Sequence, residues 1–218
     1  FNGIEGIIMN GAMTITLDND GYNVTMGAFA QSLSTGAGAD TITLANNNMT
    51  VSTGNGNDVI VVDATHTFDA SDNVDGGLGI DTVSITGTGA IDFTAGSINE
   101  LEFVILPDND VTITLDDDGY DVTMGDGTQQ LTLGLGDDTI HFDDNQNDVT
   151  VNSGSGDDVM TYDTSNSWTA ADSIEGDAGL DSIALTGGGT VNFTLGTFSN
   201  VEEILLSNEN YILTVGDG

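Results

Sequence analysis

Six short segments of this sequence combine glycine and aspartate at a spacing that suits cation binding. Each follows the pattern Gly-x-Gly-x-Asp-x-apolar, except that Asp177 replaces the first glycine of the last segment. Glycine permits positive φ angles and lets backbone carbonyls crowd together. Ca²⁺ takes about six to eight oxygen ligands in irregular geometry, whereas Mg²⁺ demands a tight octahedron. Carbonyls plus one carboxylate per turn therefore indicate calcium. The motif aspartates are Asp40, Asp58, Asp81, Asp138, Asp158 and Asp181.

Short strands are the elements that must position these turns. Pieces such as Thr14–Leu17 and Thr41–Leu44 alternate polar and apolar residues, which is typical of a strand with one buried face. Clusters of Gly, Asn and Asp separate the pieces, and no helical stretch is evident. Two strands in about 18 residues predict an all-β parallel β-solenoid, or β-roll, with about 18 residues per coil. An antiparallel sandwich is the alternative, but it does not explain the regular spacing of the motifs.

The chain is internally duplicated. Residues 13–27 recur at 111–125, an offset of 98, and the tail Asn99–Ile105 resembles Asn200–Leu206. Repeat architectures gain stability by stacking similar units along one axis. The duplication predicts one continuous solenoid with a first repeat over 1–100, a second over 101–200 and the start of a third over 201–218.

The motifs resemble the nonapeptides of RTX (repeats-in-toxin) β-roll proteins, and residues 76–84 fit the full pattern Gly-Gly-x-Gly-x-Asp-x-apolar-x. The resemblance covers essentially the whole chain and is strongest to repeat regions of secreted surface-layer, adhesin and matrix proteins. It implies several Ca²⁺ ions in the turns, export by type I secretion, and an extracellular or cell-surface location. Turns such as Gly27–Ala30 depart from the family pattern because they lack the aspartate. The spacing of the motifs also lengthens before Gly79 and Gly179.

The spacing assigns calcium ligands to turns that stack one coil apart. Asp40 and Asp58 are separated by one coil of the predicted length and are expected to share an ion, as are Asp138 and Asp158, whose coil is slightly longer. The turns that contain Asp18 and Asp116 are expected to lie on the same edge as neighbouring donors. A third kind of site is expected around the extended coils, from Asp72, Asp75 and Asp81 and from Asp172, Glu175 and Asp181. The full set of expected ligating residues is Asp18, Asp20, Gly36, Gly38, Asp40, Gly54, Gly56, Asp58, Asp72, Asp75, Gly77, Gly79, Asp81, Asp116, Asp118, Gly134, Gly136, Asp138, Gly154, Gly156, Asp158, Asp172, Glu175, Gly179 and Asp181.

The charge of the chain excludes several functional classes. Its 218 residues include 36 Asp and Glu but no Lys or Arg, for a formal net charge of −36. Nucleic-acid binding, polybasic membrane anchoring and most phosphoryl-transfer sites need cationic side chains. The absence of cysteine excludes disulfides, and no apolar run is long enough for a membrane helix. Because like charges on neighbouring coils repel, folding is expected to depend on bound calcium.

No catalytic constellation emerges, so the protein is interpreted as not an enzyme. His66 aligns with Asn166 and His141 with Thr43, so the duplication keeps neither histidine. Both are expected to be solvent-exposed, because a thin solenoid offers no deep pocket for an oriented base. Trp168 aligns with Phe68, which indicates packing around the extension.

The leading interpretation is a calcium-stabilised structural repeat of a secreted bacterial surface layer, adhesin or filament. Self-association, head to tail or lateral, is expected because open solenoid ends expose unpaired strand edges. Nucleic acid and direct membrane insertion are not expected. The alternative is a calcium-binding folding or secretion module of a secreted RTX enzyme or toxin. A minor alternative is ice binding by outward pairs such as Thr14/Thr16, in a ladder that Asn23/Thr25 and Val59/Val61 interrupt.

Overall fold

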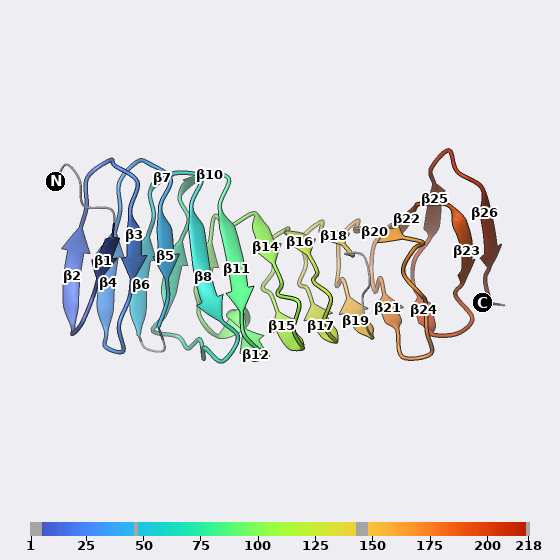
Figure 1. The fold of residues 1–218 in the computed structure, drawn as a ribbon, viewed down its shortest axis with the longest axis horizontal. Coiled ribbons are helices and arrows are strands. Elements are labelled where there is room, and N and C mark those ends of the chain that lie inside the picture. Colours follow the sequence, from blue (N-terminus) through green and yellow to red (C-terminus); the bar gives the residue numbers. More distant parts are fainter. Residues whose placement is uncertain (1–5, 46–47, 143–147, 217–218) are drawn as a thin grey trace. The chain divides into compact units, whose positions relative to one another are not determined.

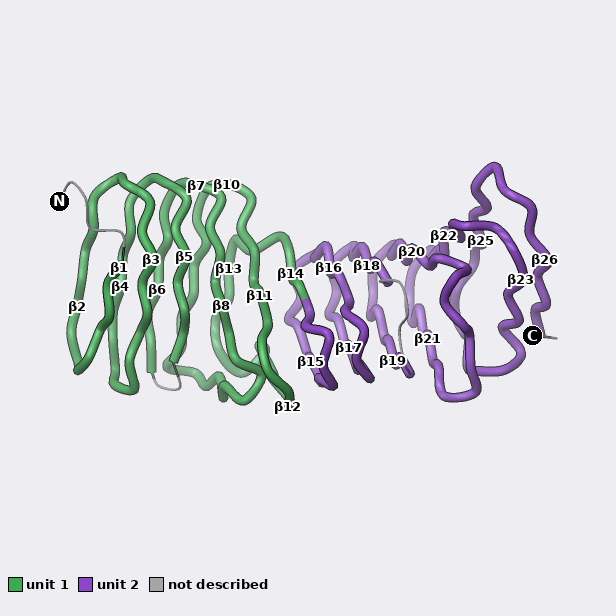
Figure 2. Tube along the Cα trace, viewed as in Figure 1, with its two compact units in different colours: residues 1–105 green, residues 106–218 purple. Residues whose placement is uncertain are grey.

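Short parallel strands dominate both halves of the protein. The computed structural model describes residues 6–45, 48–142 and 148–216 (Figure 1). The chain divides into two compact units, unit 1 at Phe1–Ile105 and unit 2 at Leu106–Gly218 (Figure 2). Within each unit, strands one coil apart pair in parallel register, as in β3 with β5 and β18 with β20. The predicted parallel β-solenoid is therefore confirmed.

Two walls of strands build unit 1. Successive strands alternate between the walls for most of the unit, so each coil adds one strand to each wall. The first wall contains β1 (Gly6–Ile8), β3 (Asn23–Thr25), β5 (Thr41–Thr43), β8 (Val59–Asp63), β11 (Thr82–Thr86) and β14 (Phe103–Ile105). The second wall contains β2 (Met13–Thr16), β4 (Gln31–Ser34), β6 (Met49–Ser52), β9 (Asn73–Asp75) and β13 (Ser97–Asn99). Between β11 and β13 the chain forms β12 (Gly89–Asp92) and the 3-10 turn η1 (Phe93–Ala95).

Unit 2 has the same construction. Its first wall contains β16 (Asp121–Thr123), β18 (Thr139–His141), β20 (Val159–Asp163), β22 (Ser182–Thr186) and β25 (Glu203–Leu206). Its second wall contains β15 (Val111–Thr114), β17 (Gln129–Thr132), β19 (Val149–Asn152), β21 (Ser173–Glu175) and β24 (Thr197–Ser199). A separate parallel pair joins β23 (Gly189–Asn192) to β26 (Tyr211–Thr214).

Coil length varies within each unit. In unit 1, Asn23 pairs with Thr41 and Thr41 with Val59, so the numbering advances by 18 in each of these coils. Val59 then pairs with Thr82, an advance of 23, and Thr82 pairs with Phe103, an advance of 21. Unit 2 ends with the same advances of 23 and 21 between β20, β22 and β25. The predicted coil length therefore holds only for the regular part of the solenoid.

The core consists of rows of apolar side chains, one from each coil. No coil can bury its own inward side chain, because each is only two short strands wide, so the next coil must cover it. On the inner strands of the first wall, the row in unit 2 is 0% exposed and the matching row in unit 1 is at most 3% exposed, whereas Ile7 on β1 and Ile204 on β25, at the ends of these rows, are only partly buried. These rows are Val122, Ile140, Met160 and Ile183, and Val24, Ile42, Ile60, Val83 and Val104.

The extra residues of the longest coils form a loop that carries its own aromatic cluster. In unit 1, His66 lies edge-on to Phe68 at a centroid distance of 4.4 Å, and Phe68 contacts Phe93 at 4.8 Å. In unit 2, Trp168 takes the place of Phe68 and lies 5.3 Å from Phe193. The loop therefore extends the hydrophobic core, as the pairing of Phe68 with Trp168 predicts.

His66 is not solvent-exposed, contrary to the sequence-based expectation. Its side chain is 2% exposed, its Nε2 has no hydrogen-bond partner in the described part of the chain, and burial lowers the pKa of the imidazole. Its aromatic neighbours hold the ring in the core of the loop. His141, by contrast, is partly exposed on β18, and its Nε2 lies 3.3 Å from the Asp121 carboxylate.

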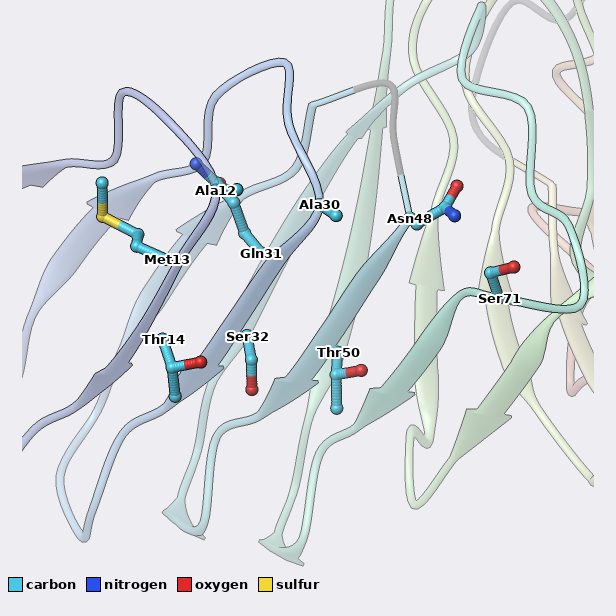
Figure 3. Close-up of a pocket in the computed structure, with 9 residues that line it drawn as sticks. All are labelled: Ala12, Met13, Thr14, Ala30, Gln31, Ser32, Asn48, Thr50 and Ser71. Carbon is cyan, nitrogen blue, oxygen red and sulfur yellow. The ribbon is translucent and has the colours of Figure 1, made fainter.

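Hydroxyl side chains form a row on the outer face of the second wall in unit 1. Thr14, Ser32 and Thr50 lie in register on β2, β4 and β6 and point away from the strands (Figure 3). The next position in the row is Asn73, which ends the hydroxyl series. The pair Thr41/Thr43 lies on the other wall, so the two sets of threonines do not form one ladder. The sequence alone did not show that these threonines lie on different walls of the solenoid.

No helix in the described part of the chain is long and apolar enough to cross a membrane.

Candidate metal centre

The Gly-x-Gly-x-Asp turns stack on one edge of each unit, where the second wall leads into the first. In unit 1, the turn at Gly54–Asp58 connects β6 to β8, and the turn at Gly77–Asp81 connects β9 to β11. The short strands β7 (Asn55–Gly56) and β10 (Leu78–Gly79) pair in parallel within these two turns. Because the turns themselves pair, their glycines and aspartates recur once per coil along the edge.

The motif aspartates of unit 1 form a hydrogen-bonded ladder. The backbone N–H of Asp40 donates to Oδ1 of Asp58 at 2.8 Å, and the N–H of Asp58 donates to Oδ1 of Asp81 at 2.7 Å. At the start of the ladder, the N–H of Tyr22 donates to Oδ1 of Asp40 at 2.7 Å. Each carboxylate therefore ties its own turn to the turn of the preceding coil.

Unit 2 repeats this ladder with the same geometry. The N–H of Tyr120 donates to Oδ1 of Asp138 at 2.6 Å, and the N–H of Asp138 to Oδ1 of Asp158 at 2.8 Å. The N–H of Asp158 then donates to Oδ1 of Asp181 at 2.9 Å. The duplication thus preserves the position of each aspartate and also the bond that it accepts.

The second oxygen of each ladder carboxylate is buried and has no hydrogen-bond partner among the described residues. This holds for Oδ2 of all six ladder aspartates, whose side chains are at most 1% exposed. A buried carboxylate oxygen without a donor or counter-ion is costly, and a cation removes that cost. The six oxygens belong to Asp40, Asp58, Asp81, Asp138, Asp158 and Asp181.

Glutamates close both ladders, and the sequence analysis missed them. The N–H of Asp81 donates to Oε2 of Glu102 at 2.7 Å, and the N–H of Asp181 to Oε2 of Glu202 at 2.9 Å. These final turns are shorter, because only residues 100–102 separate β13 from β14, whereas residues 76–81 separate β9 from β11. A glutamate has one more methylene than an aspartate and can reach across from the shorter turn.

The structure also shifts the alignment of these tails by one residue. Glu100 and Asn200 both have positive φ, at 51° and 50°, and so occupy equivalent positions. The offset is therefore 100, rather than the 101 implied by matching Asn99 with Asn200. The Gly-Asp motifs already give an offset of 100 residues between the two repeats. An alignment with this offset matches Glu102 with Glu202, and that match could have identified them from the sequence.

Glycine is required in these turns because the coils approach closely. Gly54 has a φ of +95°, and a Cβ built there would lie 2.0 Å from the carbonyl oxygen of Gly36. Gly154 is equivalent, with a φ of +88° and a Cβ 2.1 Å from the carbonyl oxygen of Gly134. The side chain of any other residue would push neighbouring turns apart.

Gly54→Ala is therefore expected to destabilise the protein by about 2 kcal/mol or more, since positive φ alone costs about 1–2 kcal/mol for a residue with a Cβ. Gly6→Ala is the control, because the nearest atom to its added Cβ lies 4.0 Å away. Denaturant unfolding measures both variants. Equal stability of the two would contradict the close approach of the turns.

The aspartates before the first motif turn lie on the same edge, as expected. The turn that contains Asp18 and Asp20 stacks on Gly36 and Gly38, whose added Cβ atoms would contact its backbone at 2.3 and 2.9 Å. The hydroxyl of Tyr22 donates to Asp18, and this bond lowers the pKa of that carboxyl. These contacts place Asp18 beside the ladder and engage it with a tyrosine.

Unit 2 has the same arrangement at Asp116–Asp118. The Tyr120 hydroxyl donates to Oδ1 of Asp116 at 2.6 Å. Burial raises the pKa of Asp118, and the charges of Asp116 and Asp117 add to this effect. A cation beside this turn would offset that unfavourable charge on Asp118.

The expected third site around the extended coil does not assemble from the residues assigned to it. Asp72 lies at the start of β9, whereas Asp81 lies at the start of β11, on the other side of the coil. Both oxygens of Asp72 accept backbone hydrogen bonds, from Met49 at 3.0 Å and Asp69 at 2.9 Å. This carboxylate therefore closes the extension loop, at the end of β9 that lies away from the Gly-Asp turn.

In the second repeat, Asp172 has the role of Asp72. Its carboxylate accepts from the N–H groups of Val149 and Thr169 at 3.0 and 2.6 Å. Glu175 accepts from the hydroxyl of Ser199 at 2.6 Å and from the amide of Asn200 at 2.5 Å. Of the residues assigned to the third kind of site, Asp75 does lie near the ladder, because it ends β9 directly before the turn that carries Asp81, and its charge helps to raise the pKa of Asp81.

The ladder carboxylates are poorly suited to a metal-free fold. Burial raises the pKa of Asp81 to about 6 and the pKa of Asp138 to about 7. Burial also raises the pKa values of Asp40, Asp158 and Asp181. Charge on these groups is therefore unfavourable in the folded state unless a cation compensates it.

Metal-free protein is accordingly expected to be more stable in acid than at neutral pH. Below the unfolded-state pKa, near 4, these carboxyls are neutral in both states and do not lower the free energy of unfolding. Above the folded-state pKa values of about 6 and 7 they are charged in both states, and their destabilising effect on the fold is complete. Stability should fall as the pH rises from about 4 to 7. Urea unfolding in chelator across this range measures the effect, and a rise in stability would contradict it. Calcium should flatten the profile.

The donor set fits a hard cation that also takes backbone or water oxygens. Among the described residues, no three His, Asp or Glu side chains converge closely enough to hold a metal ion by themselves. The ladder instead supplies one free carboxylate oxygen per coil, beside turns rich in glycine carbonyls. Ca²⁺ accepts such mixed oxygen shells and irregular geometry.

No family model matches the sequence, and comparisons with curated proteins and with solved structures give no match either.

Proposed function

We propose that this chain is a calcium-stabilised structural repeat of a secreted bacterial cell-surface or matrix protein. The observation that carries the proposal is the pair of carboxylate ladders, in which every aspartate leaves one buried oxygen without a partner among the described residues. In this proposal, Ca²⁺ ions bind between successive turns and compensate those oxygens. Because the sites exist only in the folded chain, the free energy of calcium binding adds to the stability of the fold.

The ladder geometry supports a metal role over a purely structural one. An aspartate that only shaped the turn would need the Oδ1 bond to the adjacent coil and nothing more. The same residue type at all six positions also adds a buried negative charge, which an asparagine would avoid. Asn and Asp are both good turn formers, so the choice of the charged residue points to a cation.

The charge of the chain supports an extracellular site of action. With 36 acidic residues and no Lys or Arg, the chain depends on cations from solution to neutralise its charge. Extracellular calcium modules bind the ion with dissociation constants of about 0.1–1 mM. We place the protein outside the cell, where calcium reaches such concentrations, and infer export of the calcium-free chain before its calcium-stabilised fold is complete.

A structural role is favoured over catalysis by what the surface offers. The hollow over β2, β4 and β6 is lined by Thr, Ser, Asn, Gln, Ala and Met, and none of these described lining residues is titratable (Figure 3). Two strands that pair on one side only carry exposed apolar side chains, with Ile8 on β1 71% exposed and Ile212 on β26 67% exposed. We infer self-association through such strand edges into a layer or filament.

Ion content and assembly state together test this proposal. Purified protein is dialysed against calcium at millimolar concentration, and bound calcium is measured by elemental analysis alongside electron microscopy and sedimentation. Several bound ions together with sheets or fibres are expected. Bound ions in a protein that remains monomeric would favour a folding module of a secreted enzyme or toxin. Absence of bound calcium in a folded protein would overturn the proposal.

A further inference from the structure

The acidic residues are divided unequally between two units of similar length. Unit 1 contains 13 Asp and Glu, and unit 2 contains the other 23 of the 36. Neither unit has a Lys or Arg to offset these charges. The two solenoids therefore share one architecture but differ greatly in internal repulsion.

Part of the difference lies beside the ladder itself, at the residue that precedes each of the first two ladder aspartates. In unit 1 these positions hold Ala39 and Asn57, and in unit 2 they hold Asp137 and Asp157. The stacked turns at the start of each ladder differ in the same way, with Asn19 in one unit and Asp117 in the other.

The replacement of Asn57 by Asp157 changes charge and almost nothing else. Oδ1 of Asn57 accepts from the N–H of Ile80 at 3.2 Å, and Oδ1 of Asp157 accepts from the N–H of Leu180 at 2.9 Å. Asp137 makes the same kind of bond, from the N–H of Asp157 at 2.8 Å. Unit 2 thus has a second, exposed row of carboxylates directly alongside its buried ladder.

These added charges act on the metal-free fold. Two carboxylates about 7 Å apart repel by roughly 0.5–1 kcal/mol in a water-like dielectric, and several such pairs accumulate along stacked coils. The repulsion is partly screened by salt, with a Debye length of about 8–10 Å. It is relieved far more effectively by divalent ions bound within the ladder.

We propose that unit 2 is the calcium-responsive half of the chain, which unfolds when calcium is withdrawn while unit 1 keeps its fold. The charge distribution gives unit 2 the larger difference in stability between the metal-free and the calcium-bound state. The inference rests on the proposed calcium role, because it assumes that the ions bind along the ladder. It adds that calcium loss opens one half of the protein selectively.

Hydrogen exchange of the unmodified full chain tests the inference. Peptic peptides from both units are followed at pH 8 and low ionic strength, in calcium and in chelator. We expect calcium to increase protection in unit 2 at least about tenfold more than in unit 1. The fluorescence of the only tryptophan, Trp168, buried in unit 2, should report the same transition. In molar sodium chloride the difference between the units in chelator should shrink.

Isosteric variants locate the cause. The variant Asp117→Asn/Asp137→Asn/Asp157→Asn keeps every Oδ1 acceptor and is expected to increase protection of unit 2 in chelator. Its counterpart, Asn19→Asp/Asn57→Asp, is expected to decrease protection of unit 1 in chelator. Both should match the unmodified chain when calcium is saturating.

The outcomes separate this inference from the proposed function. Equal sensitivity of the two units to calcium, or greater sensitivity of unit 1, would overturn the inference and leave calcium binding intact. Exchange that does not change with calcium in either unit, together with no bound ion, would overturn both.

Discussion

Calcium is expected to raise the free energy of unfolding of this protein by about 2.7 kcal/mol for each site held at a hundred times its dissociation constant. The gain arises because the unfolded chain does not assemble stacked turns, so only the folded state offers the buried oxygens of the ladders. With several sites per chain, the effect should exceed that of any single substitution. In chelator at low salt, much of the β-sheet circular dichroism should be lost, chiefly from unit 2.

Thermal unfolding in calcium and in chelator, at matched ionic strength and pH 8, measures this effect. Magnesium is the matched control, since it shares the charge of calcium but needs a tighter octahedral shell. It should restore less stability than calcium at the same concentration. Identical melting curves in calcium, magnesium and chelator would show that the ladder oxygens do not bind a divalent ion.

Asp158→Asn is expected to change the stability of the protein in opposite directions with and without calcium. The amide keeps an Oδ1 that can accept the 2.8 Å bond from the N–H of Asp138. In chelator, removal of a buried charge whose pKa burial has raised should stabilise the fold at pH 8. In calcium, the same change removes an anionic ligand and should weaken binding by roughly tenfold or more.

Isothermal calorimetry and denaturant unfolding in both conditions measure these two signs. Asp148→Asn is the control, because it removes the same charge from an exposed position next to β19, away from the Gly-Asp turns. It should leave calcium affinity nearly unchanged. If Asp158→Asn shifts stability by the same amount in calcium and in chelator, the carboxylate serves only to shape the turn.

The sequence predicts the solenoid because its two main signals are local and periodic. Alternation within the short strand pieces identifies the inward face of each strand, and stacking buries residues such as Ile42 and Ile60 as expected. The regular spacing of the Gly-Asp motifs likewise predicts that Asp40 and Asp58 lie in adjacent turns, as they do.

The features that the sequence analysis missed depend on contacts that lie outside the Gly-Asp motifs. The carboxylate of Asp72 accepts from the N–H groups of Met49 and Asp69, which motif spacing does not reveal. Glu102 closes a ladder from a turn that lacks the motif entirely. His66 is buried against the ring of Phe68, although imidazoles are only intermediate in their tendency to be buried. In each case a specific contact in the folded chain decides the role of a residue whose type alone suggests another.

The extra length of the longest coils lies entirely on the side away from the Gly-Asp turns. Residues 64–72 take up the added length, whereas the turn from Gly54 to Asp58 and the turn from Gly77 to Asp81 have equal length. Insertions are thus absorbed on one edge while the opposite edge keeps its register. A peptide epitope grafted near Ser71 is therefore expected to be displayed without altering the register of the Gly-Asp turns.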